Sequence, residues 1–286
     1  MLLPAGGKGG AATSNTTCAS PLVMESFRTD VLGGATAHMV QNVVILEGCR
    51  HFEASHLAGI FTNLTSLSSV TIQHDPDSDN MKATTDAMVV PTAIGKLNTI
   101  RYIDLRGLQV ARLPSELGML TDLLGLFIER CPSALRPMTG GTGGAHQPES
   151  VLALPSELSS LTNLQTLGLS AVGGSGTAIS TLVAKMPKLR QLVLQHNGFE
   201  SFDLPPPAQL PYLWQVDVMN NSLSALPFAS FHKLATTTGS YSTLAELNMM
   251  HNRIRTLPEH VASALRGVKL LRYVVCGVWG AVCGVV

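Results

Sequence analysis

Apolar residues recur along this chain in a spaced phrase, L-x-x-L-x-L, in which isoleucine, valine and methionine replace some of the leucines. The last two apolar positions of the phrase are two residues apart, which is the spacing of a β-strand with one buried face. Self-similarity of this kind predicts a repeat architecture. We expect nine strands, which begin near Gln41, Leu67, Ile100, Leu123, Leu164, Leu189, Leu213, Leu244 and Leu270.

A Leu-Pro step follows several copies of the phrase, as in the linker LPSEL at residues 113–117 and again at 154–158. Proline has no N–H group to donate, so it ends a strand and favours a short helical or irregular segment. Leu113, Leu117 and Leu120 are three or four residues apart, which turns one side of that segment toward the core. The pattern therefore predicts parallel strands on one side and short return segments on the other.

An asparagine stands three residues after the phrase in the later copies, at Asn197, Asn221 and Asn252. A buried amide in a turn can bond backbone groups that the strands leave without partners. We expect these three asparagines to be buried. Earlier copies have other residues there, which makes the turns of the N-terminal half less regular.

Together the L-x-x-L-x-L phrase, the LPSEL linkers and the asparagines resemble the leucine-rich repeat superfamily, from about Gln41 to Val275. The resemblance implies an α/β fold: a leucine-rich repeat solenoid, or horseshoe, with a parallel concave β-sheet and short helical or irregular convex segments. The LPSEL-type linkers look like those of intracellular signalling and scaffold members. That likeness implies recognition of a protein partner by the concave face and the rim.

The expected organisation has four parts. Residues 1–21 form a disordered tail, and residues 22–40 form an irregular N-terminal cap. Residues 41–275 form a solenoid of about nine repeats, with insertions near 73–90 and 132–150 where the repeat period runs long. Residues 276–286 form an apolar tail. This tail has three interpretations: a truncated gene end, a buried strand with a hydrophobic plug, or the start of a membrane span.

Composition narrows the function. The chain is 45% hydrophobic and 13% charged, and its 19 basic residues balance 19 acidic ones without a basic cluster. This excludes the electrostatic footprint of a nucleic-acid binder. The five cysteines are scattered and form no CxxC pair, which argues against a cysteine zinc site and favours a reducing, cytoplasmic compartment.

No pattern in the sequence pairs a nucleophile with a base, and no phosphate loop or HExxH zinc motif is present. We therefore expect no enzyme activity, no cofactor and no small-molecule substrate. The string Asp75 to Asp86 partly matches a calcium loop. Asn80 replaces the turn glycine and Asp86 replaces the usual glutamate, so a solvated acidic loop is favoured. His74, His196 and His251 share one repeat position and are interpreted as surface histidines rather than metal ligands.

Residues between the buried leucines should line the concave surface. Aromatic residues flanked by arginines have the composition of interface hot spots. The alternative is that these are ordinary residues of a tolerant surface. The hypothetical partner-binding residues are Tyr102, Asp104, Arg106, Phe127, Glu129, Arg130 and Trp214.

The predicted function is a non-catalytic protein–protein interaction module with a signalling or scaffold role. The alternative is an ectodomain fragment of a leucine-rich repeat cell-surface receptor. That alternative predicts membrane association and glycosylation at Asn63 or Asn220, which begin Asn-x-Ser/Thr triplets.

Overall fold

The computed structural model describes residues 39–46, 54–73, 88–108, 110–130, 151–225, 244–255, 270–275 and 282–285, the last two ranges as backbone only. They lie in two compact units. Unit 1 comprises Met1–Cys131 with Ala153–Leu161, and unit 2 comprises Pro132–Leu152 with Thr162–Val286.

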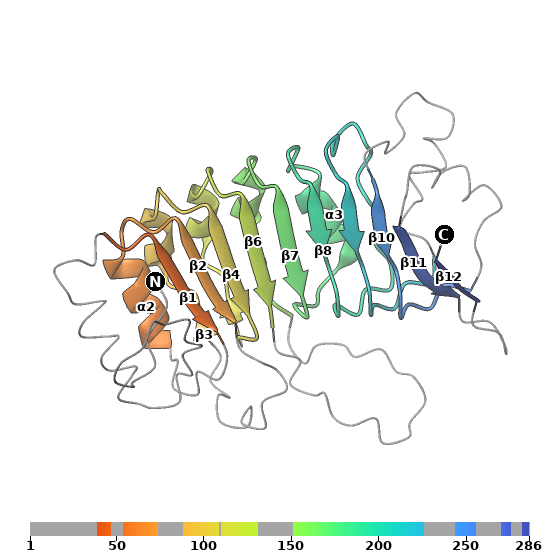
Figure 1. Ribbon diagram of the computed structural model, residues 1–286, viewed down its shortest axis with the longest axis horizontal. Helices are drawn as coiled ribbons and strands as arrows, with labels where there is room; N and C mark the ends of the chain where they lie inside the picture. The colour runs from red at the N-terminus through yellow and green to blue at the C-terminus, as the bar shows by residue number, and fades with distance from the viewer. Residues whose placement is uncertain are drawn as a thin grey trace, which may run out of the picture. The chain divides into compact units, whose positions relative to one another are not determined.

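The described strands of unit 1 form a parallel sheet (Figure 1). Each strand pairs in register with the strand of the next repeat. In order across the sheet, the strands are β1 (Asn42–Leu46), β2 (Ser69–Gln73), β4 (Tyr102–Arg106) and β6 (Gly125–Glu129).

Unit 2 repeats the arrangement with parallel strands in chain order, followed by one antiparallel strand. The parallel strands are β7 (Thr166–Ser170), β8 (Gln191–Val193), β9 (Gln215–Asp217), β10 (Glu246–Asn248) and β11 (Leu270–Val275). Strand β12 (Val282–Val285) pairs antiparallel with β11. The nine predicted strands and the predicted fold class are confirmed, and β12 adds a pairing that the repeat phrase did not predict.

Side chains alternate between the core and the outer face along each strand. In β4, Ile103 and Leu105 are each 1% exposed, whereas the residues between and beside them face outward. In unit 2, Leu192, Val216 and Leu247 occupy the equivalent inward position and are buried. Burying one such side chain stabilises the fold by roughly 1.5–3 kcal/mol, so each repeat depends on its leucine positions.

Short helical segments follow the prolines, as the Leu-Pro steps predict. The 3-10 helices of unit 1 are η3 (Thr92–Lys96), η4 (Ser115–Met119) and η5 (Ser156–Ser160). Pro91, Pro114 and Pro155 precede them in extended conformation. Longer α-helices fill the same place in two repeats, as α2 (Ala54–Asn63) in unit 1 and α3 (Gly176–Val183) in unit 2.

Glycine allows successive 3-10 helices of unit 1 to pack closely. A Cβ built on Gly118 of η4 would lie 2.6 Å from the Cβ of Glu157 in η5, and closer still to its backbone oxygen. Gly95 of η3 is similar, because a Cβ there would lie 2.8 Å from the Cβ of Glu116 in η4. Both contacts are shorter than a side chain permits, so these positions require glycine.

A second, smaller sheet lies before the 3-10 helices of unit 1. Strand β3 (Met88–Val89) pairs in parallel with β5 (Val110–Arg112), and Arg112 bridges to Ala153. The last residues of the insertion expected near 73–90 therefore form part of the repeat framework. Residues 74–87 of that insertion, including the calcium-like string, lie outside the described residues, as do the insertion near 132–150 and the predicted tail 1–21.

The buried asparagines of unit 2 bond the backbone as predicted. Asn197, Asn221 and Asn252 are 2%, 7% and 4% exposed. The Oδ1 of Asn221 accepts the N–H groups of Asn197 and Phe199, each at 3.1 Å, and its Nδ2 donates to the backbone oxygen of Leu194 at 2.8 Å. Each amide thus joins one turn to the turn before it.

The residue before each of these asparagines has a left-handed backbone. His196, Asn220 and His251 have φ values of 59°, 56° and 56°. Histidine and asparagine adopt this conformation more readily than most residues. The recurrence of histidine at this position is therefore explained by backbone conformation.

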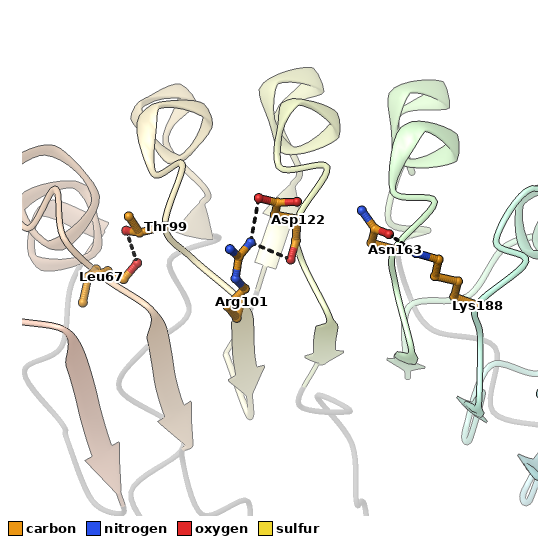
Figure 2. A network of polar contacts seen from close by, with 6 residues as sticks. All are labelled: Leu67, Thr99, Arg101, Asp122, Asn163 and Lys188. Carbon is orange, nitrogen blue, oxygen red and sulfur yellow. Dashed lines mark hydrogen bonds and ion pairs between the residues drawn. The ribbon is translucent and has the colours of Figure 1, made fainter.

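Polar contacts also join the turns that lead into the strands (Figure 2). In unit 1, Arg101 forms an ion pair with Asp122 at 2.9 Å, and Thr99 donates to the backbone oxygen of Leu67 at 2.7 Å. In unit 2, Lys188 donates to Asn163 at 2.7 Å. The Arg101–Asp122 pair is exposed, so its net contribution is only about 0–1 kcal/mol.

Candidate protein-binding surface

The outward face of the unit 1 sheet carries the densest group of predicted site residues. We define this surface by the outward side chains of β2, β4 and β6. They are Ser69, Thr71, Gln73, Tyr102, Asp104, Arg106, Phe127 and Glu129. Register places Tyr102 opposite Gly125, Asp104 opposite Phe127, and Arg106 opposite Glu129.

Arg106 is held in one orientation by two neighbours. Its Nε donates to Asp104 Oδ1 at 2.9 Å, and its guanidinium carbon lies 4.6 Å from the centre of the Phe127 ring. Gln73 Nε2 donates to the other carboxylate oxygen of Asp104 at 3.0 Å. The four side chains therefore form a connected group across three strands, in which Asp104 is 15% exposed and Arg106 40% exposed.

Tyr102 is the most exposed member of this surface, at 51%. Its ring lies across β6, because a Cβ built on Gly125 would approach Tyr102 Cδ1 to 2.8 Å. Glycine at 125 therefore provides the space that the ring fills. The prediction that Tyr102 and Phe127 are diagonal neighbours agrees with the register, but the two rings do not stack on each other within the described part of unit 1.

Glu129 and Arg130 end β6 in different environments. Glu129 faces outward and is partly exposed. Arg130 follows the last strand residue, and burial lowers the pKa of its guanidinium. Both side chains are partly exposed, and Glu129 is the one that belongs to the outward face of the strand.

Trp214 lies in unit 2, immediately before β9, and its side chain is partly exposed. Its backbone N–H donates to the oxygen of Arg190, and its own oxygen accepts from Ala245 and Glu246. Trp214 therefore stands at the start of the strands rather than among the outward strand residues. Tyr212, two residues earlier, is 56% exposed.

The outward face of unit 2 carries a row of hydrogen-bonded polar side chains that the sequence reasoning missed. Thr166 donates to Gln191 at 3.2 Å, Gln191 to Gln215 at 2.9 Å, and Gln215 to Glu246 at 3.0 Å. These residues share one position in successive copies of the repeat phrase. Alignment of the copies on their leucines was the signal that could have found the row.

A second polar group of unit 2 centres on Asp217. One of its oxygens accepts from Gln195 at 2.7 Å and from Asn248 at 3.0 Å, and the other accepts the backbone N–H of Met219 at 3.0 Å. Most hydrogen-bonding capacity of this carboxylate is used within the protein. The group therefore strengthens the sheet more than it offers an open acceptor.

Groups suited to metal binding do not converge in the described part of the chain. No set of three or more His, Cys, Asp or Glu side chains gathers there. His196 accepts a hydrogen bond at Nδ1 from the side chain of Asn220 at 2.8 Å, while His74 lies outside the described residues. No helix among the described residues is long and apolar enough to cross a membrane.

Comparison with known proteins adds a fold-level similarity. No family model and no curated protein matches the sequence. The solved structure of a leucine-rich repeat protein of Leptospira interrogans, LIC12759, is similar over 83% of this chain at 17% identity and a TM-score of 0.46. The match spans 62% of that protein's chain.

The repeat is visible within the chain itself. Each copy of the phrase supplies one parallel strand, the Leu-Pro steps at Pro114 and Pro155 start short helical returns, and buried asparagines join the turns of unit 2. This chain has the leucine-rich repeat fold, in which parallel strands alternate with short helical or irregular return segments.

Proposed function

We propose that the chain is a non-catalytic protein-binding module whose partner contacts the outward face of the unit 1 sheet. We further propose a signalling or scaffold role in the cytoplasm. The observation that carries the binding proposal is the group formed by Tyr102, Arg106 and Phe127. It presents an exposed tyrosine at the start of β4 and, at the end of the same strand, an arginine whose orientation is already restricted.

Restricted orientation matters because binding must offset the entropy lost when side chains become ordered. Immobilising a flexible side chain costs roughly 0.5–1.5 kcal/mol at an interface. Asp104 and Phe127 restrict Arg106 before any partner arrives, which reduces this cost. Tyrosine and arginine are also enriched among the residues that dominate binding energy.

Because the chain has no net charge, binding of a partner depends on these local contacts. The chain has a formal net charge of zero at pH 7, so its total charge gives a partner little long-range attraction. Recognition then depends on the particular side chains that a partner buries. This supports a compact contact patch rather than a broad electrostatic surface.

The test is affinity purification with mass spectrometry, using the wild-type chain and the double variant Tyr102→Ala/Phe127→Ala. We expect the variant to lose a partner that the wild type captures, with loss of each hot-spot side chain costing about 2 kcal/mol or more. Tyr212→Ala is the matched control, because it removes a similarly exposed tyrosine from unit 2. Equal capture by all three folded proteins would refute the proposed site.

The receptor-ectodomain alternative has one observation in its favour. Asn63 and Asn220, the two predicted glycosylation asparagines, are both exposed. An ectodomain would show a mobility shift on glycosidase treatment that Asn63→Gln/Asn220→Gln abolishes. A chain from its native cells that carries no glycan supports the cytoplasmic proposal instead.

A further inference from the structure

Arg106 and Glu129 are opposite charges on adjacent strands that form no ion pair with each other in the described part of unit 1. They are register partners on adjacent strands, about 4.8 Å apart at the backbone. Such a pair would ordinarily form an ion pair. Here the guanidinium of Arg106 is held at its Nε by Asp104 and at its face by Phe127, and it forms no ion pair with Glu129 within the residues of unit 1 that the structure describes.

This arrangement leaves two complementary groups open. Within the described residues, the Nη groups of Arg106 donate no hydrogen bond, and the carboxylate of Glu129 accepts none. Arg106 therefore offers a fixed donor fork, and Glu129 offers an acceptor one strand further along the sheet. Asp104 already balances the charge of Arg106, so the donor fork carries little net charge, whereas Glu129 keeps its negative charge.

The group that fits an adjacent donor and acceptor is dipolar. In an extended strand, a residue presents its N–H and its C=O at the same edge, as in the reciprocal bonds of antiparallel pairs. Arginine N–H groups can donate to that C=O, and a glutamate oxygen can accept from that N–H. A charged side chain would satisfy one member of the pair and be repelled by the other.

We infer that Arg106 and Glu129 bind the main chain of an extended segment of the partner protein, with Tyr102 contacting a more distant side chain of the partner. This inference rests on the proposed function of the unit 1 surface, and it names the chemistry of the partner. Main-chain bonds supply affinity in peptide recognition, while neighbouring side-chain contacts supply specificity. Tyr102 lies four residues before Arg106 on the same outward face of β4 and is 51% exposed, so it is available for a contact further along the segment.

The first experiment selects binders from a library of short linear peptides displayed on phage, using the full chain as target. Selected peptides are synthesised with each backbone nitrogen methylated in turn. Main-chain recognition predicts that methylation at one position lowers affinity about tenfold, because a hydrogen bond and its close approach are lost. Affinity that survives methylation at every position overturns the inference, and so does a selection that yields no binder.

Paired variants separate main-chain contacts from ion pairs. Arg106→Gln/Glu129→Gln keeps a donor and an acceptor without charge, whereas Arg106→Leu/Glu129→Leu removes both. The inference predicts that the glutamine pair binds the selected peptide within about threefold of wild type, and that the leucine pair loses about tenfold or more. Equal loss in both variants indicates a charged ligand side chain and overturns the inference.

Two controls distinguish failure of the main-chain inference from unfolding of a variant and from failure of the proposed function. The peptide methylation series uses the wild-type chain, so it remains decisive even where a leucine variant unfolds. The native partner captured through Tyr102 and Phe127 is then offered to the leucine pair. Capture that survives in this variant, but fails in Tyr102→Ala/Phe127→Ala, overturns the main-chain inference and leaves the proposed function intact.

Discussion

At the scale of single residues, the buried asparagines contribute strongly to stability, because each one forms hydrogen bonds to several backbone groups. Asn221 accepts two backbone N–H groups and donates to the oxygens of Leu194 and Val218. Its replacement leaves buried backbone groups without partners. Each such group costs roughly 1–3 kcal/mol.

Asn221→Ala should therefore destabilise the protein by about 3 kcal/mol or more. Urea unfolding followed by circular dichroism measures this. Asn163→Ala provides the comparison, because its side chain accepts from Lys188 at the surface. It should cost under about 1 kcal/mol, and similar losses in the two variants would refute the role given to Asn221.

The left-handed position before each asparagine gives a second residue-level prediction. His251 has φ of 56° and an exposed side chain, so its replacement tests backbone conformation with little change in packing. His251→Gly should be close to neutral, whereas His251→Val should cost about 1–2 kcal/mol, because a β-branched residue is strained there. Equal stability of the two variants would contradict this explanation of the histidine column.

The sequence predicted the buried asparagines, because one residue type recurs at one position. It did not predict the left-handed backbone positions, because several residue types adopt that conformation. Asn197, Asn221 and Asn252 were recognisable because the same amide stands at the same offset. A left-handed backbone occurs at four residues whose side chains have no chemistry in common: Ala171, His196, Asn220 and His251. Their conformation is apparent only once the turns are seen.

At the scale of elements, the stacking of η3, η4 and η5 depends on glycine at the fourth helical position. Gly118→Ala should cost about 1–3 kcal/mol, because its Cβ would overlap Glu157 and force one helix to move. Ser159→Ala changes the corresponding position of η5 and should lie within about 0.5 kcal/mol of wild type. Thermal unfolding compares the two, and a neutral Gly118→Ala would contradict the close packing.

Some helices and strands could be predicted from the sequence and others could not. Proline before η4 and η5 marks where a strand cannot continue, and leucine spacing marks the buried side. Strand β3 has two residues and sits at the end of a segment read as an insertion, so no periodicity could reveal it. Strand β12 depends on pairing with β11, and that pairing is antiparallel where every repeat strand is parallel.

At the scale of the whole molecule, one side of each strand builds the core and the other remains available. Alternation predicted which side chains of β4 and β6 face outward, because a strand period of two leaves no other choice. It could not predict that Arg106 turns to Asp104 and Phe127 instead of Glu129. That choice depends on side-chain torsions and on the space that Gly125 leaves for Tyr102.

The most direct test of the account is hydroxyl-radical footprinting of the full chain, alone and bound to its captured partner. Tyr102 and Tyr212 are similarly exposed, at 51% and 56%, and so report on two surfaces in one experiment. The account predicts that partner binding protects Tyr102 and Phe127 from oxidation while Tyr212 stays reactive. Protection of Tyr212 with unchanged reactivity at Tyr102 would contradict it.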